Sequence, residues 1–433
     1  MPNQKTISGS NTVVVDNPTK QRFFLVAILF IGIAVAFLDR VNVSVLVANE
    51  QFLLDMGIIG QPVKIGMLMS LFLVTYGIAN ITLSPLGDYI GPRKAMTICI
   101  LLMIISLFMG GLAGTFTMML AARIVLGIGE GFYYPMQSLY VKNWFPPKER
   151  GRANATWIIG QSLAPALAMP FFAYIIAAYG WRFSFFACVA LTLIPMYLFW
   201  FHTKDTPREH KKVNAAELQH IEEGLAQELK NKDVLVKESV LSRLKLFVFN
   251  YRYWLLVCWY ASLQMMYWGL IAWLPTYLKS TKGFSWTEMG WLASLPFIAG
   301  MVFKGFSGVI CDRLGRSAPV LAMAMLLASI CIYTGIIAAD KYVAAVLIAC
   351  GIGFSTMGTP AAWTLLQGLV PGKSLSIAAG TMNGLSTGLS ALSPVVIGFF
   401  ITTTGGMDGA LYFIVGIGIA AAGLASILAV QKY

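Results

Sequence analysis

Twelve apolar stretches, each long enough to cross a lipid bilayer as a helix, make up most of this chain. About 20 consecutive apolar residues suffice for such a crossing. Charged residues form only 12% of the 433-residue sequence, about half of the ~25% typical of soluble domains. We therefore predict an all-α membrane protein with twelve transmembrane helices. Their approximate ranges are 22–48, 64–86, 94–114, 117–141, 152–178, 183–201, 252–279, 287–310, 317–337, 341–366, 374–404 and 408–430.

One long polar segment, residues 202–250, divides these stretches six and six and contains all three histidines. Within it, Asn214 and Glu217 have the spacing of a capping box and predict a short helix over about 215–230. The expected organisation is a cytoplasmic tail at 1–21, a six-helix bundle at 22–201, a cytoplasmic linker at 202–250 and a second six-helix bundle at 251–433.

Lys and Arg residues are unevenly distributed between alternate loops. With the amino terminus inside, the cytoplasmic segments outside the linker hold 13 of them and the opposite side holds 5. Because cytoplasmic loops of membrane proteins carry the excess of positive residues, both termini are expected to be cytoplasmic. The net charge of +12 thus mostly reflects topology, and no nucleic-acid partner is expected. Six scattered cysteines indicate neither a disulfide framework nor a metal site.

An internal repeat relates the two groups of stretches. Residues 87–93 (GDYIGPR) align with 311–317 (CDRLGRS) at an offset of 224, and Gly127-Ile-Gly129 aligns with Gly351-Ile-Gly353 at the same offset. This predicts two parallel six-helix repeats, and transporters built from repeats bind their substrates near the midplane between them.

Several motifs resemble those of a known family. Residues 308–316 (GVICDRLGR) resemble the loop signature of the major facilitator superfamily, while the first copy departs from it at Ser84 and Tyr89. A set of motifs along nearly the whole chain is similar to the anion:cation symporter family, which includes galactonate, glucarate and hexuronate transporters and the sialins. These motifs are Asp39-Arg40, Arg123 with Glu130, Trp144-Phe145-Pro146, residues 149–153, Gly180-Trp181-Arg182 and residues 273–278. The resemblance implies the major facilitator fold.

Five ionisable residues lie inside the expected helices: Asp39, Arg40, Arg123, Glu130 and Lys304. Each costs at least about 2.5 kcal/mol at a bilayer centre, so each needs a water-filled cavity, a charged partner or a ligand. Arg123 and Glu130 share a helix face but are separated by about 10.5 Å along the axis, and the neighbours Asp39 and Arg40 diverge by about 100°. We therefore expect Asp39 and Arg40 to have different partners. Structural ion pairs between the first and fourth helices are the alternative to a functional role.

The chemistry of these side chains indicates handling of an anion and protons. Arginine grips a carboxylate through two parallel hydrogen bonds, and carboxyl groups in an apolar cavity can bind and release protons near neutral pH. At the repeat offset, the second half has uncharged residues where the first has its four charges, so the first half is expected to handle charge. The resemblance implies that Arg40 contacts the anion, that Asp39 and Glu130 carry protons and that Arg123 tunes Glu130.

Further residues are assigned more loosely. Tyr76, Gln161, Trp363 and Asn383 match positions that line the family's substrate site, and Tyr267 and Trp268 are additional candidates; packing or hydrogen bonding between helices is the alternative for each. Lys304 either extends toward the cytoplasmic face or forms a second anion contact or gate. Five residues are expected to form charge and helix-dipole locks on the inward gate: Asp88, Arg93, Asp312, Arg313 and Arg316.

Together these features predict proton-coupled symport of a small organic anion, such as a sugar acid, by alternating access at the inner (plasma) membrane. The chain is expected to be a monomer without nucleic-acid partner, metal or cofactor other than protons. Sugar-acid transporters of the family that this chain resembles carry hydroxyl residues just before the matching tryptophan, whereas residues 359–363 (TPAAW) have only that of Thr359. This departure leaves a less polar aliphatic or aromatic carboxylate as an alternative substrate. Proton-independent anion exchange and sodium coupling are the nearest alternative mechanisms. A transporter-like sensor and a membrane enzyme are more distant ones.

Overall fold

The structure, a computed structural model, describes residues 17–83, 86–232, 245–370 and 374–431. Within these ranges all regular elements are helices, and twelve helical segments are long and apolar enough to cross a membrane. The predictions of an all-α membrane protein and of twelve spans are therefore confirmed. The spans before the linker are α1 (Gln21–Leu46), α3 (Pro62–Leu83), α5 (Pro92–Gly111), α6 with α7 (Phe116–Gly131, Tyr133–Trp144), α8 with α9 (Pro147–Ile158, Gly160–Tyr179) and α10 (Trp181–His202).

The spans after the linker follow the same plan. They are α13 (Tyr251–Thr276), extended by the π-helix η2 (Tyr277–Thr281), α14 with α15 (Trp286–Leu292, Leu295–Leu314), α16 (Ala318–Ile337), α17 (Lys341–Leu369), α18 with α19 (Leu375–Ser390, Leu392–Thr404) and α20 (Met407–Val430). Short helices α2 (Glu50–Asp55), α4 (Leu86–Ile90), η1 (Pro207–Glu209) and α11 (Ala215–Lys232) lie between or beside the spans.

Three spans are interrupted where a proline stands in the first turn of the helix that continues them. Pro135 follows the break between α6 and α7, Pro296 that between α14 and α15, and Pro394 that between α18 and α19. Proline lacks a backbone N–H and its ring clashes with the carbonyl four residues earlier, so it is favoured in the first turn of a helix. The break after Gly131 ends α6 immediately beyond Glu130.

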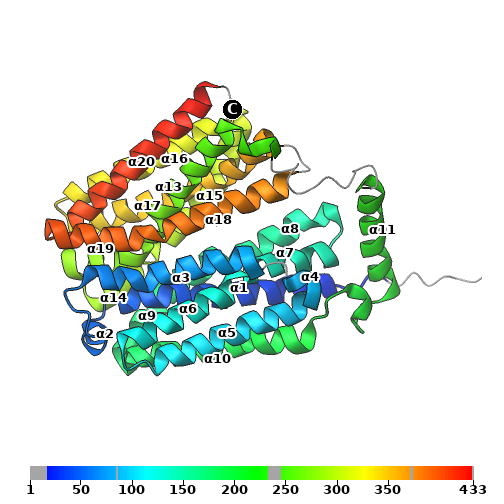
Figure 1. Cartoon of the computed structure of the whole chain (residues 1–433), viewed down its shortest axis with the longest axis horizontal. Coiled ribbons are helices and arrows are strands. Elements are labelled where there is room, and N and C mark those ends of the chain that lie inside the picture. The colour runs from blue at the N-terminus through cyan, green and yellow to red at the C-terminus, as the bar shows by residue number, and fades with distance from the viewer. Residues whose placement is uncertain (1–16, 84–85, 233–244, 371–373, 432–433) are drawn as a thin grey trace, which may run out of the picture.

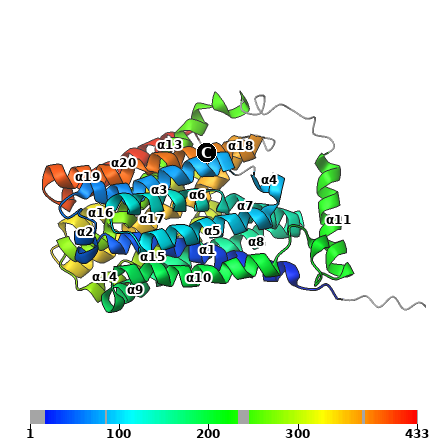
Figure 2. The same ribbon diagram turned by 60° about the horizontal axis from the view of Figure 1, so that its bottom comes forward.

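The six spans before the linker form one bundle and the six after it form another, shown below and above in Figure 1. The two bundles touch through α1 with α13, α3 with α18 and α19, and α9 with α14 and α15. Figure 2 shows that α2 and α14 lie at one end of the molecule and α11 at the other. We refer to these as the α2 end and the α11 end.

Close contacts join the two bundles at the α2 end. The indole of Trp286 donates a hydrogen bond to the carbonyl of Ala173 (2.5 Å), and the hydroxyl of Thr276 donates one to the carbonyl of Val47 (3.3 Å). Gly66 of α3 lies against the backbone of Pro394, where a Cβ would have no space. This end of the molecule is therefore closed.

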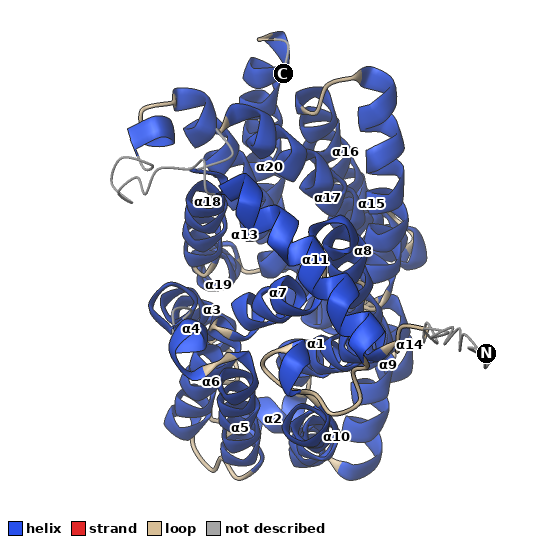
Figure 3. Cartoon of the chain, turned by 90° about the vertical axis from the view of Figure 1, so that its right-hand side faces the viewer, coloured by secondary structure: helices blue, strands red, loops and turns tan. Residues whose placement is uncertain are grey.

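The linker helix α11 lies across the opposite end (Figure 3) and is attached to the first bundle. Asn214 caps α11 by accepting a hydrogen bond from the backbone N–H of Glu217 (3.0 Å). The predicted capping box is only half formed, because the Glu217 side chain turns to α1 instead. It accepts hydrogen bonds from the backbone N–H groups of Gln21 and Arg22 (3.2 Å each) and from the Arg22 guanidinium (3.0 Å).

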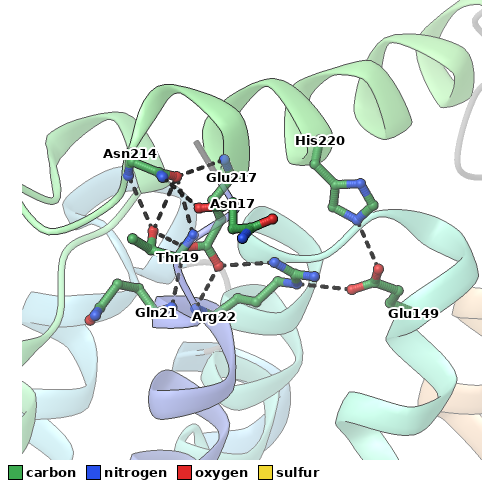
Figure 4. A network of polar contacts seen from close by, with 8 residues as sticks. All are labelled: Asn17, Thr19, Gln21, Arg22, Glu149, Asn214, Glu217 and His220. Atoms are coloured by element: carbon green, nitrogen blue, oxygen red, sulfur yellow. Dashed lines mark hydrogen bonds and ion pairs between the residues drawn. The ribbon is translucent and has the colours of Figure 1, made fainter. Parts of the chain in front are cut away.

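These contacts continue into a network with the helix α8, drawn in Figure 4. Arg22 also pairs with Glu149 (3.0 Å), whose other carboxylate oxygen contacts His220 (2.8 Å). We call Arg22, Glu149, Glu217 and His220 the linker cluster. A carboxylate at the start of α1 is favoured because the N-terminus of a helix has unpaired N–H groups and a positive dipole end.

Candidate functional site

Four of the five charges predicted inside the membrane form two ion pairs between α1 and α6. Arg40 Nε lies 2.5 Å from Glu130 Oε2, and Arg123 Nη1 lies 3.5 Å from Asp39 Oδ2. All four residues are buried. The adjacent residues Asp39 and Arg40 thus have different partners, as their divergence on the helix predicts. The ion-pair partner of Arg123 is Asp39 and not Glu130, the residue that it was expected to tune.

The two pairs leave polar atoms without hydrogen-bond partners among the described residues. Glu130 Oε1, both carboxylate oxygens of Asp39 and Arg123 Nη2 are buried in this state, although Arg123 Nε donates to the carbonyl of Leu68 (3.3 Å). A buried polar group without a partner costs about 1–3 kcal/mol, and more when it is charged. Protonation of these carboxylates, or a hydrogen bond from a new donor, would therefore lower the free energy of the site.

Aromatic rings surround the guanidinium of Arg40. Its central carbon lies 4.4 Å from the ring centre of Phe37, 5.4 Å from that of Phe72, 4.8 Å from that of Tyr76 and 5.6 Å from that of Trp268. Trp268 belongs to α13 of the second bundle, so Arg40 lies where the two bundles meet. The structure brings the predicted residues Tyr76 and Trp268 to the predicted Arg40.

Phe37 and Phe72 were not singled out from the sequence. A signal exists in their spacing, because Phe37 precedes Arg40 by three residues and Phe72 precedes Tyr76 by four. Residues three or four apart lie on the same helix face. Aromatic residues are so frequent in this chain, at 13%, that the spacing alone does not distinguish these two from packing residues.

A second group of aromatic and polar residues lies near Tyr76. Tyr134 lies beside the predicted Gln161, and Tyr260 packs edge-to-face on the predicted Trp363 with ring centres 6.0 Å apart. Tyr134 and Tyr260 are both close to Tyr76. This group therefore joins α3, α7 and α9 of the first bundle to α13 and α17 of the second.

The other predicted substrate residues are placed less directly. Tyr267 packs edge-to-face on Trp268 with ring centres 5.3 Å apart. Asn383 is half-buried on α18, and the described contacts do not connect it with Arg40 or Tyr76. Tyr134 and Tyr260 are residues that the sequence reasoning missed.

The expected gate residues are only partly described. Arg93 donates from its backbone N–H to Asp205 (2.7 Å) and from its guanidinium to the carbonyl of Trp200 (2.6 Å). Trp200 belongs to α10 of the same bundle, and Asp205 lies at the start of the linker that follows it. Arg313 and Arg316 are exposed. The side chains of Asp88 and Asp312 lie outside the described residues, and the gate role of all five stays a prediction.

The chain matches one family model and is similar to known transporters. Residues 29–394, and again 287–433, match the family model described as Major Facilitator Superfamily. The chain is 27% identical to a probable galactarate/D-glucarate transporter of Bacillus subtilis (strain 168), over 92% of this chain and 89% of that protein. It is 29% identical to a probable sulfoacetate transporter of Cupriavidus necator (strain ATCC 17699 / DSM 428 / KCTC 22496 / NCIMB 10442 / H16 / Stanier 337), over 90% and 89%.

A solved structure shares the fold. The crystal structure of a bacterial homologue of the human lysosomal transporter Spinster, in an inward-facing and unoccupied conformation, superposes with a TM-score of 0.76 at 17% identity, covering 94% of this chain and 97% of that one. Twelve apolar helices in two bundles, a match to the family model over most of the chain and relatives that are transporters agree with one another. The chain is a multi-pass membrane transporter, not an enzyme, and belongs to the Major Facilitator Superfamily.

Proposed function

We propose that this chain is a secondary transporter that carries a small organic anion together with protons across the inner (plasma) membrane. The observation that carries the proposal is the buried Arg40–Glu130 ion pair at the meeting point of the two bundles. The relatives described above are named as transporters of galactarate, glucarate and sulfoacetate, which are all small organic anions.

Arg40 is suited to exchange one carboxylate for another. Its ion pair with Glu130 uses Nε, and a guanidinium has four further N–H donors on its two terminal nitrogens. When Glu130 takes up a proton, its attraction for Arg40 falls, and the positive charge is released to hold the carboxylate of a substrate. Proton binding and anion binding then favour each other. Protonation of Glu130 leaves the positive charge of Arg40 without a partner, and the substrate carboxylate supplies one.

The second ion pair supplies another proton site. Neither carboxylate oxygen of Asp39 has a hydrogen-bond partner among the described residues, and its ion-pair distance to Arg123 is long at 3.5 Å. Protonation of Asp39 removes a buried charge that this loose pair compensates poorly. We assign Asp39 to proton coupling beside Glu130.

Alternating access uses the two ends of the molecule in turn. Contacts between the bundles close the α2 end. If the termini are cytoplasmic, as the distribution of Lys and Arg indicates, the closed side is the outer one. The anion and protons would then leave toward the cytoplasm in this conformation.

The test is Glu130→Gln in proteoliposomes loaded with a carboxylate that the wild type transports. Counterflow exchange is expected to survive, because it needs no net proton movement, whereas uptake driven by a pH gradient is expected to fall to the rate seen without a gradient. Glu50→Gln, a change of an exposed acid at the α2 end, is the matched control and should behave like the wild type.

Three results would contradict the proposal. Normal gradient-driven uptake by Glu130→Gln would remove this residue from proton coupling. Wild-type uptake that leaves the pH of the vesicle lumen unchanged would favour anion exchange, and uptake that requires a sodium gradient would favour sodium coupling.

A further inference from the structure

We propose that Lys304 is a second anion-binding residue, and that the transported molecule carries two acidic groups, one held by Arg40 and the other by Lys304. The inference rests on the proposed function, because it assumes that an organic anion binds between the bundles. It adds the substrate class and a contact from the second bundle.

Lys304 points away from the lipid. The outward side of α15 is marked by Ile298, Val302 and Phe306, which are spaced four residues apart and are 45–58% exposed. Lys304 stands two residues from both Val302 and Phe306, which is about 200° around the helix. Its side chain is nevertheless only half-buried. This remaining exposure therefore faces the interior of the protein, and extension along the lipid surface does not explain it.

The packing of α15 against α17 indicates the depth of Lys304 in the membrane. Gly300 lies against Thr356. The helices α15 and α17 belong to the eighth and tenth spans, so they cross the membrane in the same direction. Lys304, one turn further on the same face, is thus level with Pro360, one turn before Trp363. The indole of Trp363 packs on the ring of Tyr260, which lies close to Tyr76.

The helix α15 also borders the first bundle. It packs against α9, and the adjoining α14 places Gly290 against Ala173. The span formed by α14 and α15 runs antiparallel to α9, so an advance of 14 residues along each brings Lys304 to about the level of Ile159, two residues from Gln161. Lys304 is therefore at about the same depth in the membrane as Pro360 of the second bundle and the region of Gln161 in the first.

Among the charges inside the described spans, Lys304 lacks a partner of opposite charge. Asp39, Arg40, Arg123 and Glu130 compensate each other in pairs. Lys304 has no ion-pair or hydrogen-bond partner in the part of the chain that the structure describes, although a charge within the membrane needs one. A ligand with a single carboxylate, held by Arg40, would leave this cation unpaired. A ligand with two acidic groups would satisfy both cations.

The test compares acids that differ only in the second acidic group. Binding to the purified protein is measured by thermal shift and titration calorimetry for galactarate against D-galactonate, and for unbranched diacids of four to eight carbons against monoacids of the same length. The unbranched series covers different spans between the two cations and a less polar substrate. The variants are Lys304→Met, Lys304→Arg and the control Lys64→Met, which removes an exposed lysine at the α2 end.

The wild type is expected to bind at least one diacid roughly 10- to 100-fold more tightly than its monoacid, the range for one charge-assisted hydrogen bond. Lys304→Met should abolish this preference while leaving the monoacid affinity unchanged. Lys304→Arg should restore much of it, and Lys64→Met should not alter it. Methionine matches the length of lysine without its charge, and the melting temperature without ligand verifies that each variant is folded.

Two outcomes would overturn the inference alone: equal binding of diacids and monoacids by the wild type, or an equal loss of both in Lys304→Met. Failure of every carboxylate to bind the wild type would instead contradict the proposed function. The two failures are therefore distinguishable.

Discussion

Arg40 has two roles that separate on substitution. It compensates the buried Glu130 carboxylate at 2.5 Å and presents its remaining donors among the rings of Tyr76 and Trp268. The first role needs only a positive charge, while the second needs the planar fork of a guanidinium, which lysine lacks. Removing the charge altogether would leave Glu130 buried without compensation, which typically costs about 3–5 kcal/mol of stability.

Arg40→Lys is therefore expected to keep the protein folded while weakening substrate binding by roughly 10- to 100-fold, because a bidentate contact becomes a point contact. Titration calorimetry with a transported carboxylate measures the affinity, and the melting temperature without ligand measures stability. Arg40→Ala should lose both substrate affinity and stability. Unchanged affinity in Arg40→Lys would show that Arg40 does not hold the anion.

At this scale the sequence reveals which residues are charged inside the membrane, because Asp39, Arg40, Arg123 and Glu130 interrupt apolar stretches. It also predicts that the two neighbours on α1 have different partners. It does not reveal that Arg123 pairs with Asp39, since this depends on how α1 is rotated and shifted against α6. Tyr134 was missed for a similar reason, as its relation to Gln161 exists only after α7 and α9 have packed.

At the scale of elements, the apolar stretches predict the spans well because a helix in lipid has a minimum length. The interruptions were missed, although Pro135, Pro296 and Pro394 stand in the sequence, because membrane helices also tolerate proline in their interior. The linker helix was expected over 215–230 and extends over Ala215–Lys232. The side chain of Glu217 was expected to cap that same helix and caps α1 instead.

The linker cluster is expected to respond to acid. Burial raises the pKa of Glu149, but the hydrogen bonds and positive charges of His220 and Arg22 outweigh it and hold the pKa below the usual 4.5. A lowered pKa means that the ionised carboxylate stabilises the docked linker. This contribution is complete above about pH 5 and is lost as the pH falls through the lowered pKa.

Hydrogen exchange of α11 between pH 7 and pH 3.5, corrected for the intrinsic rate, measures this effect. The wild type should lose protection of α11 as the pH falls. Glu149→Gln should have weaker protection at pH 7 and a smaller change on acidification. Identical profiles for the wild type and Glu149→Gln would contradict the assignment.

At the scale of the whole molecule, the repeat at an offset of 224 predicts two similar bundles, but it does not predict which end of the molecule is closed. That depends on contacts between bundles, such as Gly66 with Pro394 and Trp286 with Ala173, which must break when the α2 end opens. The two bundles also differ in kind. The first contains the paired charges, and the second contributes Trp268, Trp363 and the unpaired Lys304.

The number of protons that the two paired carboxylates, Asp39 and Glu130, deliver determines how transport responds to the membrane potential. The fixed charges of the protein return to their starting places in every cycle, so the net charge moved equals that of the substrate plus its protons. If Asp39 and Glu130 each deliver one proton, a doubly charged anion crosses with no net charge. A potential of 100 mV is worth about 2.3 kcal/mol per elementary charge and would then have no effect.

Uptake of a diacid at a fixed pH gradient is therefore expected to proceed at the same rate whether or not a potassium gradient with valinomycin imposes a potential. A singly charged acid carried with two protons would be accelerated by an inside-negative potential. Slower diacid uptake under that potential would show that only one of the two carboxylates delivers its proton. The electrical response of intact vesicles thus counts the protons that the two buried acids carry.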